Sequence, residues 1–496
     1  MSTVNSPTIK SSSIPSVVQE TGNILIKNGF DAYLVGGCVR DLLIGRSPKD
    51  WDLTTNATPE EIISLFPETF YENDFGTVGV VTDANDESLK IIEITPYRKE
   101  GKYSDHRRPD SVEWGKTIEE DLERRDFTIN AIGYNLKENT AIDPWNGSGD
   151  IEEKIIKTVG KPTDRFEEDG LRIMRAIRLF AELQFAIDYD TMTAITEKAP
   201  LLSKISAERV RDEFIRIIAS PRPDEGLALM QKLGLLKEII PELEEGVGVA
   251  QNQAHAYSVW EHLLRTVEHA AQKDYSLPVR LAALFHDIGK PKSRRFDESK
   301  NDWTFHGHEV IGAKMTQKIM ERLRFPKDLT EDVTKLVRWH MFFSDTEQIS
   351  LSAVRRMVRN VGKERIWRLM DVRVCDRIGT GRPKESPYRL RKYHAMIEEV
   401  MSDPISVDML KIDGGKIMEL LGIKPGPRIG WLLHALLEEV LENPLLNTEE
   451  YLQKRVVELN KLSDTDLKKL GEEARKTKEQ EQEKQISDIK KKHFVQ

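Results

Sequence analysis

Two aspartates, Asp50 and Asp52, stand on either side of Trp51, and their type and spacing point directly to chemistry. In an extended strand, residues two apart face the same side, so both carboxylates are expected next to each other. Carboxylates placed in this way can hold two Mg²⁺ ions, one activating a hydroxyl nucleophile and the other steadying a triphosphate leaving group. An Asp-x-Asp pair is also common at a solvated strand end, so the pair alone leaves both interpretations open.

A pair of glycines precedes these aspartates. The run LVGG leads into CVRDLLIG, which predicts a strand ending at Val35, a turn at Gly36 and Gly37, and a helix that carries Arg40. Glycines at such a junction let backbone N–H groups approach a phosphate at the N-terminus of a helix. Gly-Gly turns are frequent in α/β proteins, so the turn becomes informative only together with the aspartates that follow it.

Four motifs, in this order, resemble those of one family. GGCVRD, DWD, RRDFTINA and EEDGLRIMRAIR together resemble the class II tRNA nucleotidyltransferases and the related bacterial poly(A) polymerases, over roughly residues 20 to 230. The resemblance implies an α/β nucleotidyltransferase head, with a small mixed β-sheet and helices, followed by an all-α neck, body and tail. It makes Asp50 and Asp52 the catalytic, Mg²⁺-binding carboxylates. It also implies a set of nucleotide-binding residues: Gly36, Gly37, Arg40, Arg125, Asp126, Asn130, Asp169, Arg172 and Arg175.

Within RRDFTINA, the resemblance places Arg125 and Asp126 against the ribose and the phosphates, with Asn130 in support. An arginine fork binds phosphate oxygens, and a carboxylate accepts a hydrogen bond from a ribose 2′-hydroxyl. Glu93, in the strand-like run IIEIT, is a candidate for a third acidic residue of the site. A partly exposed strand glutamate is an equally good interpretation of Glu93.

A helix is expected from near Glu167, with Glu168, Asp169 and Arg172 on its opening turns and the last two as neighbours on one face. Such a pattern stabilises any helix through its dipole, which is the structural alternative. In the resembling family, the equivalent carboxylate accepts from the amino group that C and A share, and the arginine donates to the acceptor ring nitrogen. A polar mismatch of this kind discriminates by about 10⁴. Selection of CTP and ATP without a nucleic-acid template is therefore feasible. The resemblance also implies that the helix SAERVRDEF, which carries Arg209, braces the neck.

A second group of candidate ligands lies downstream. The runs VWEHLLRT, LFHDIGKPK, FHGHEVIGA, LVRWHMFF and VCDRIGT together resemble the HD superfamily of metal-dependent phosphohydrolases, over roughly residues 254 to 379. The resemblance implies one metal site from His262, His286, Asp287 and Asp376, with His308 and His340 for a second ion. Imidazole and carboxylate ligands suit Mn, Ni, Fe or Zn, and Mg as well. Because such a metal activates water against a phosphoester, we expect hydrolysis at damaged RNA 3′ ends.

The elements that position these residues divide the sequence into segments. Residues 1–20 are rich in Ser and Pro and are expected to be disordered. Alternating β-rich and helical runs predict the head at 21–160, and apolar residues at helical spacing predict an all-α remainder. Breakers divide that remainder into a neck (161–225), an HD-containing body (226–400), a tail (401–447) and a charged C-terminal helix (448–496). The resemblance implies base selection by the neck and RNA binding by the tail. The polar segment between Pro96 and Glu120 predicts a mobile loop, which the resemblance connects with addition of the final A.

Charge is unevenly distributed. The net charge is −9, but the segment from Leu351 to Lys392 carries 13 Lys and Arg against 4 Asp and Glu. We interpret its basic residues at helical spacing as a surface for the acceptor arm of tRNA, with a solvated helix face as the alternative. These residues are Arg355, Arg356, Arg359, Lys363, Arg365 and Arg368.

Composition excludes several other classes of protein. No apolar run approaches the roughly 20 residues needed to span a bilayer, no signal peptide is recognisable, and two cysteines make no disulfide framework. The sequence thus predicts a cytoplasmic enzyme that adds C and A from CTP and ATP to the 3′ end of tRNA and releases pyrophosphate, with neither DNA nor membrane as a partner. Two alternatives remain: a poly(A) polymerase, and an HD metal-dependent phosphohydrolase with an RNA-binding head.

Overall fold

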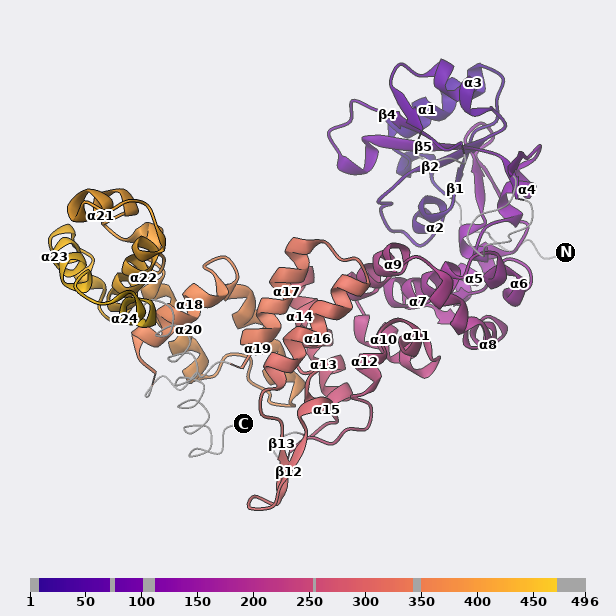
Figure 1. Ribbon diagram of the computed structural model, residues 1–496. Coiled ribbons are helices and arrows are strands. Elements are labelled where there is room, and N and C mark those ends of the chain that lie inside the picture. Colours follow the sequence, from indigo (N-terminus) through magenta and orange to yellow (C-terminus); the bar gives the residue numbers. More distant parts are fainter. Residues whose placement is uncertain (1–8, 72–75, 101–111, 253–255, 342–348, 471–496) are drawn as a thin grey trace. The chain divides into compact units, whose positions relative to one another are not determined.

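The structure is a computed structural model that describes residues 9–71, 76–100, 112–252, 256–341 and 349–470 (Figure 1). The chain forms two compact units. The first comprises Met1–Val247 with Ile319–Phe325, and the second comprises Gly248–Lys318 with Pro326–Gln496. The residues of the mixed α/β head all belong to the first unit.

A seven-stranded mixed sheet forms the centre of the head, in the order β3-β4-β5-β2-β1-β8-β9. Its strands are β1 (Tyr33–Val35), β2 (Asp52–Thr55), β3 (Thr69–Tyr71), β4 (Val78–Val81), β5 (Ile91–Pro96), β8 (Gly133–Asn135) and β9 (Thr140–Ile142). Strands β2 and β5 pair in parallel, whereas the other neighbours pair antiparallel. Leu34, Leu53, Ile92 and Ile94 are fully buried, as expected of apolar side chains on the central strands of a sheet. The parallel pair places Asp52 opposite Glu93.

Helices and a small ribbon complete the head. The helices are α1 (Ser16–Lys27), α2 (Gly37–Leu43), α3 (Pro59–Leu65), α4 (Ile118–Glu123) and α5 (Gly147–Glu153). Strands β6 (Arg98–Glu100) and β7 (Val112–Trp114) pair on either side of residues 101–111, so part of the predicted mobile loop forms a ribbon and residues 101–111 of it lie outside the described residues. Strand β10 (Ile155–Ile156) pairs in parallel with β11 (Ala186–Ile187), which already belongs to the following helical region.

The prediction of disorder up to residue 20 is wrong for its second half. Helix α1 begins at Ser16, and Ile9, Ile14 and Val18 are buried. The side chain of Gln19 donates hydrogen bonds to the carbonyl oxygens of Ser11 and Ile14, at 3.0 and 2.8 Å. The Ser- and Pro-rich composition concealed three apolar residues spaced to pack against the head, and their burial orders the segment.

The helical remainder of the first unit consists of short amphipathic helices. They are α6 (Pro162–Glu168), α7 (Leu171–Leu183), α8 (Tyr189–Lys198), α9 (Ala207–Ala219), α10 (Pro223–Lys232), α11 (Leu235–Ile239) and α12 (Pro241–Glu244). Helix α7 packs against α9 and α10 and buries Ile173, Met174 and Ile177 completely. The i, i+1, i+4 spacing of these three residues places them on one face of α7, which is the face that packs into the helical region.

The second unit is built almost entirely from helices. They are α13 (Val259–Gln272), α14 (Leu277–Phe285), α15 (Lys290–Ser293), α16 (His308–Arg322), α17 (Lys327–Trp339), α18 (Leu351–Val361), α19 (Ile366–Gly379), α20 (Tyr388–Val400), α21 (Gly414–Leu421), α22 (Pro427–Glu442), α23 (Glu449–Leu459) and α24 (Asp464–Lys468). Helix α13 packs against α14 and α19, and α14 also packs against α17. A hairpin of β12 (Arg295–Asp297) and β13 (Asp302–Thr304) interrupts the helices. Together with β11, this hairpin departs from the expectation that strands end with the head.

Six basic residues between Leu351 and Lys392, which the sequence indicated as a free surface, contact other parts of the chain. Arg355 donates to Asp403 at 2.7 Å and to the carbonyl oxygen of Leu441 at 3.1 Å, and its side chain is buried. Arg356, also buried, pairs with Glu438 and Glu442 of α22.

The other four basic residues in that group are also engaged. Arg359 pairs with Glu438, Arg365 and Arg368 pair with Asp332, and Lys363 donates to the carbonyl oxygen of Met401. Five of these six residues pair with acidic side chains distant in sequence, and tRNA binding by this group stays a prediction. Their role in this structure is to join helices. In the part of the chain that the structure describes, none of the helices is long and apolar enough to cross a membrane.

Candidate functional site

The glycine turn lies directly against the two aspartates. Gly36 has a φ of +76°, a conformation that L side chains rarely adopt. A Cβ atom at Gly36 would lie 2.9 Å from Nη1 of Arg125 and 3.4 Å from Oδ2 of Asp52. At Gly37, a Cβ atom would lie 3.9 Å from Oδ1 of Asp50. The turn therefore borders both carboxylates, and its two glycines leave space above them.

Three acidic side chains gather beside the turn. Burial, followed by the charges of Asp50 and Glu93, raises the pKa of Asp52 to about 7. Asp50 is exposed and lies just before β2, which begins at Asp52, so the expected strand is shorter than the sequence indicated. The charge of Asp50 nevertheless raises the pKa of Asp52, so the two carboxylates lie close enough to interact. A cluster of like charges at the mouth of an open turn fits a divalent cation, since a cation would relieve their repulsion.

A continuous hydrogen-bonded chain, the Arg40–Arg175 network, connects the turn to helix α7. Arg40 donates to Asp41 at 2.7 Å and to Oδ1 of Asn130 at 2.8 Å. Asn130 in turn donates to Asp126 at 3.1 Å, and Asp126 pairs with Arg175 at 2.6 Å. Burial would raise the pKa of Asp126, but Arg175 and Asn130 outweigh it and hold that pKa well below its usual range. The structure thus brings four predicted nucleotide-binding residues into one network.

Arg125 is held by a separate contact. Its Nη2 atom donates to Oδ2 of the buried Asp121 at 3.1 Å, while Arg124 donates to Oδ1 of the same carboxylate. Asp121 therefore holds Arg125 with its Nη1 atom close to Gly36. No local pattern marks Asp121 in the sequence, because an acidic residue on a short surface helix is usually solvated.

The base-reading pair predicted in the neck does not lie on one helix. Helix α6 ends at Glu168, and Asp169 occupies the break before α7, with φ −143° and ψ 106°. The expectation of a single helix was wrong, because the Oδ1 atom of Asp169 accepts from the backbone N–H of Leu171 and starts a new helix. Arg172 lies on the first turn of α7 and donates to Glu168 and to the carbonyl oxygen of Arg124.

Arg209 braces this junction from helix α9. Its guanidinium donates to both oxygens of Asp169, at 3.2 and 2.6 Å. The bracing contact expected of SAERVRDEF is present, and it fixes the orientation of the Asp169 carboxylate. Asp169 and Arg172 thus each have their own partner, and neither side chain neutralises the other.

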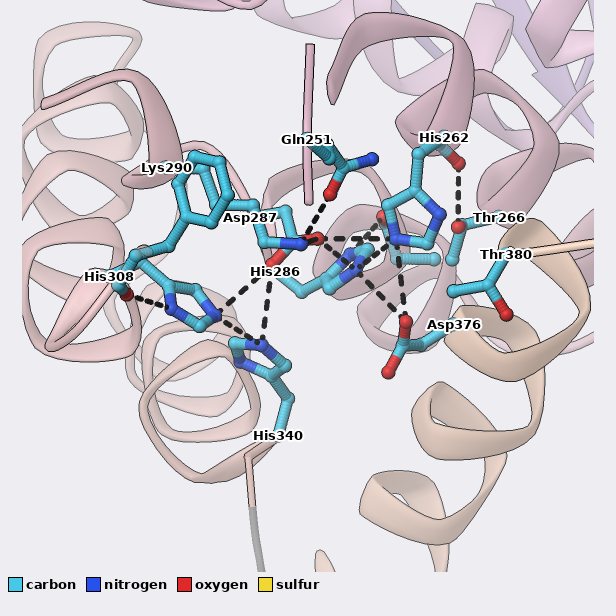
Figure 2. Close-up of polar contacts among 12 residues, drawn as sticks. Gln251, His262, Thr266, His286, Asp287, Lys290, His308, His340, Asp376 and Thr380 are labelled. Atoms are coloured by element: carbon cyan, nitrogen blue, oxygen red, sulfur yellow. Dashed lines mark hydrogen bonds and ion pairs between the residues drawn. The ribbon is translucent and has the colours of Figure 1, made fainter. Parts of the chain in front are cut away.

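Six candidate metal ligands converge in the second unit (Figure 2). They are His262, His286, Asp287, His308, His340 and Asp376, and all are buried. They come from α13, the end of α14, the start of α16, the end of α17, and α19. Two groups of three offer ligand atoms that all lie within 4.8 Å of one another: His262, His286 and Asp376, and Asp287, His308 and His340.

Backbone carbonyl groups orient three of the imidazole rings. The Nδ1 atoms of His286, His308 and His340 lie 2.7–2.8 Å from carbonyl oxygens of Ala283, Phe305 and Val337. A ring that donates through Nδ1 presents Nε2 as the acceptor, which is the atom that a metal requires. In each ring, Nε2 faces the neighbouring ligands. The donor set and its orientation therefore fit a metal centre.

Asp287 lies between the two groups. Its Oδ2 atom is 3.2 Å from Nε2 of His262 and 3.3 Å from Nε2 of His286, and its Oδ1 atom is 3.2 Å from Nε2 of His308. The sequence assigned Asp287 to the first group alone, whereas the structure also places it in the second. The Asp287 carboxylate could therefore bind a metal ion in each of the two groups.

Two cations that the sequence did not single out contact the ligand carboxylates. Nζ of Lys290 lies 2.6 Å from Asp287 and donates to Gln251, and Arg373 pairs with Asp376 at 2.6 Å. Asp287 and Asp376 raise the pKa of His286 to about 10, although burial alone would lower it. Lys290 is three residues after Asp287 in the run HDIGK, and this spacing was the signal in the sequence that could have predicted their contact.

The fold and the head site define a nucleotidyltransferase joined to an HD unit. Family models match in three places: "Poly A polymerase head domain" at residues 32–157, "Probable RNA and SrmB- binding site of polymerase A" at 184–246, and "HD domain" at 259–381. The chain is 33% identical to the CCA-adding enzyme of Geobacillus thermodenitrificans, over 86% of this chain and 92% of that protein. It is 34% identical to the CC-adding tRNA nucleotidyltransferase of Thermus thermophilus, over 85% of this chain and 92% of that protein.

Solved structures agree with these sequence relatives. The CCA-adding enzyme of Bacillus stearothermophilus in complex with CTP matches with a TM-score of 0.68 at 27% identity, covering 90% of this chain and 97% of the other. The Thermotoga maritima CCA-adding enzyme complexed with tRNA has the same fold at 19% identity, with a TM-score of 0.52 over 90% and 95% of the two chains. The chain therefore belongs to the CCA-adding enzyme family of tRNA nucleotidyltransferases.

Proposed function

We propose that this protein adds C and A residues from CTP and ATP to the 3′ end of tRNA. The observation that carries the proposal is the cluster of Asp50, Asp52 and Glu93 beneath the turn at Gly36 and Gly37. In the reaction, the RNA 3′-oxygen forms a bond to the α-phosphorus while its proton is lost, and the bond to the β-phosphate breaks to release pyrophosphate. Mg²⁺ bound by Asp50 and Asp52 would supply charge stabilisation to this exchange.

The side chains around the turn have separate tasks in this proposal. Arg40 and Arg125 bind the triphosphate, because both guanidinium groups lie at the turn and are oriented by carboxylates or an amide. Asp126 and Asn130, within the Arg40–Arg175 network, position the sugar and transmit that position to α7.

Base selection belongs to the junction between α6 and α7. Asp169 accepts from the amino group of C or A, and Arg172 donates to the adjacent ring nitrogen, with Glu168 and Arg209 orienting the pair. A base that presents a carbonyl in place of that amino group would face the Asp169 carboxylate with no proton to share. CTP and ATP are therefore accepted, and UTP and GTP are rejected.

A tRNA transcript that ends before CCA tests the proposal. Incubation with CTP and ATP, followed by sequencing of the products, should show CCA, and replacement of Asp50 or Asp52 by alanine should abolish addition. Products ending in CC would indicate the activity named for the Thermus relative. A run of A without any C would instead identify a poly(A) polymerase. Any of these other products would contradict full CCA addition.

The six converging ligands support a second activity, hydrolysis of phosphate esters at RNA 3′ ends. A metal bound there would supply an activated water. Lys290 and Arg373 hold the ligand carboxylates, and the carbonyl groups of α14 and α17 hold the imidazoles. Hydrolysis of a 2′,3′-cyclic phosphate consumes one water and breaks one P–O bond, leaving a phosphomonoester. A second hydrolysis would restore the 3′-hydroxyl that nucleotide addition needs. We place both activities in the cytoplasm.

Metal content and hydrolysis can be measured on the same variants. Protein loaded in turn with Mg²⁺, Mn²⁺, Ni²⁺, Fe²⁺ or Zn²⁺ should release phosphate from RNA ending in a 2′,3′-cyclic phosphate. The Asp376→Ala variant should lose one bound ion and Asp287→Ala both, because only Asp287 faces both groups. Hydrolysis should survive Asp52→Ala, which would separate the two sites. No phosphate release with any of the metals would refute the second activity.

A further inference from the structure

The hairpin of β12 and β13 lies between two metal-ligand positions in the chain. It follows His286 and Asp287 through the short helix α15, and it leads through Phe305 to His308 at the start of α16. Figure 1 shows it extending beyond α15, away from the helices of its own unit. Two strands of three residues bury little by themselves, so this hairpin contributes little to the core.

One face of the hairpin is an aromatic stack that is open to solvent. Phe296 and Trp303 are register partners, and their rings meet edge to face with centroids 5.2 Å apart. The guanidinium of Arg294 lies over the Trp303 ring, 3.6 Å from its centroid. The Phe296 side chain is half exposed. Arg294, Trp303 and Phe296 thus form a preformed platform, with apolar surface available at its outer end.

The basic residues of the hairpin gather at its base, whereas its acidic residues Asp297, Glu298 and Asp302 lie toward its tip, so the base is the part that suits a polyanion. Lys292, Arg294 and Arg295 precede Phe296 without an intervening acidic residue. The first acidic residue, Asp297, is paired with Lys300 at 3.7 Å and accepts from Ser299. Alternating cations and aromatic rings are the usual surface for single-stranded nucleic acid, since phosphates contact the cations and bases stack on the rings.

The base of the hairpin is part of the wall of the metal centre. The Phe305 carbonyl oxygen is the group that lies 2.7 Å from Nδ1 of His308. The ring of Phe305 lies 5.6 Å from Nζ of Lys290, and that ammonium contacts Asp287. A strand bound along the hairpin would therefore end beside the ligands, so its terminal phosphate could enter the site.

We propose that this hairpin binds the single-stranded 3′ segment of an RNA and directs its terminal phosphate to the six-ligand centre. The proposal rests on the hydrolase activity proposed above and adds the surface that binds its RNA substrate, which makes an RNA a better substrate than a free mononucleotide. Phe296 is a positioning residue in this proposal: it stacks a base and does not touch the reacting phosphorus.

The test compares two substrates on one variant. The Phe296→Ala variant should raise the KM for a short single-stranded RNA ending in a 2′,3′-cyclic phosphate by about tenfold, the usual effect of losing one stacked base. The kcat for this RNA and both constants for a 2′,3′-cyclic mononucleotide should stay within twofold of the unmodified protein. The conservative Phe296→Tyr variant should restore the KM. Tyr189→Ala, which removes an exposed aromatic ring in the other unit, is the matched control and should change neither substrate.

Binding and metal content complete the test. Fluorescence anisotropy with a labelled single strand ending in a 3′-phosphate should show the same loss of affinity in Phe296→Ala, with an unchanged number of bound metal ions. An unchanged KM for the RNA, or an equal loss on both substrates, would overturn the proposal. If the unmodified protein hydrolyses the mononucleotide but not the RNA, the hairpin proposal fails while the hydrolase stands. If it hydrolyses neither, the hydrolase fails and the hairpin proposal fails with it.

Discussion

Replacing Asp126 by asparagine tests whether the Arg40–Arg175 network acts on nucleotide addition. The change preserves size and removes one charge, so Arg175 keeps a hydrogen-bond acceptor but loses its ion pair. Asp126 accepts from Nε and Nη2 of Arg175, at 2.7 and 2.6 Å. Asp126 contacts both Asn130 and Arg175 of α7, so a weaker ion pair would loosen the positions of both residues. The nucleotide that they position would then bind less tightly.

The structure sets the size of the effect. Both bonds have a charged donor and a charged acceptor before the change and only a charged donor after it, so each weakens by about 1 kcal/mol, within the range of about 1.5–3 kcal/mol for hydrogen bonds to charged groups. The Arg175 side chain is 36% exposed, and water screens the pair, which reduces the total to about 1–2 kcal/mol. At about 1.36 kcal/mol for each factor of ten, kcat/KM should fall by about 5- to 30-fold.

The assay is single-nucleotide incorporation on two tRNA substrates, one awaiting C and the other awaiting A. The loss should be the same for CTP and ATP, because the network contacts features that the two nucleotides share. Asp143→Asn is the control, since Asp143 also accepts several hydrogen bonds in the head but contacts only the start of α5. A decrease smaller than twofold, or one confined to a single nucleotide, would refute the reasoning.

Three further predictions follow from other contacts. Arg209→Ala should leave the Asp169 carboxylate free to rotate and raise UTP incorporation relative to CTP by about tenfold, and Arg209→Lys should recover part of the selectivity; an unchanged ratio would argue against this bracing role. Arg356→Ala should lower the free energy of unfolding in urea by about 1–3 kcal/mol and leave tRNA affinity and its salt dependence unchanged, whereas a weaker salt dependence would support the tRNA-binding interpretation. Because the pKa of Asp52 is about 7, Mg²⁺ binding should release close to one proton at pH 6 and almost none at pH 8.5, as measured by calorimetry in buffers of different ionisation enthalpy; equal release at both pH values would contradict the raised pKa.

The parts of the site that the sequence predicted are those with local signals. Each of these motifs is short: the turn at Gly36, the two aspartates, and the His286–Asp287 pair. The backbone geometry within each motif follows from the rules for strands, turns and helices. The break at Asp169 was missed because the apolar period continues across it. Its signal was the Asp-Gly pair: the Asp169 carboxylate accepts from the N–H of Leu171 at the start of α7, and a Cβ atom at Gly170 would lie 3.1 Å from Cβ of Leu201.

Pairing between distant residues is the other kind of structure that the sequence did not reveal. The acidic partners of Arg355 and Arg356 lie on segments far along the chain, and no local pattern marks them. A surplus of charge in one window therefore gives no information on whether that charge is solvated. The hairpin at Phe296 and Trp303 did leave a trace, because RFD and DWT alternate as strands do, but a cluster of turn-forming residues obscured it.

Because the six converging side chains come from five separate helices or their ends, an ion bound by them would cross-link these helices of the second unit. Unfolding would have to release that ion, so its binding would increase the free energy of unfolding of the second unit. A chelator added before heating should then lower the melting temperature of this unit and expose α13 and α19 to protease, while the head unfolds at its usual temperature. Metal supply in the cell would in this way govern how long the protein persists, in addition to what it catalyses.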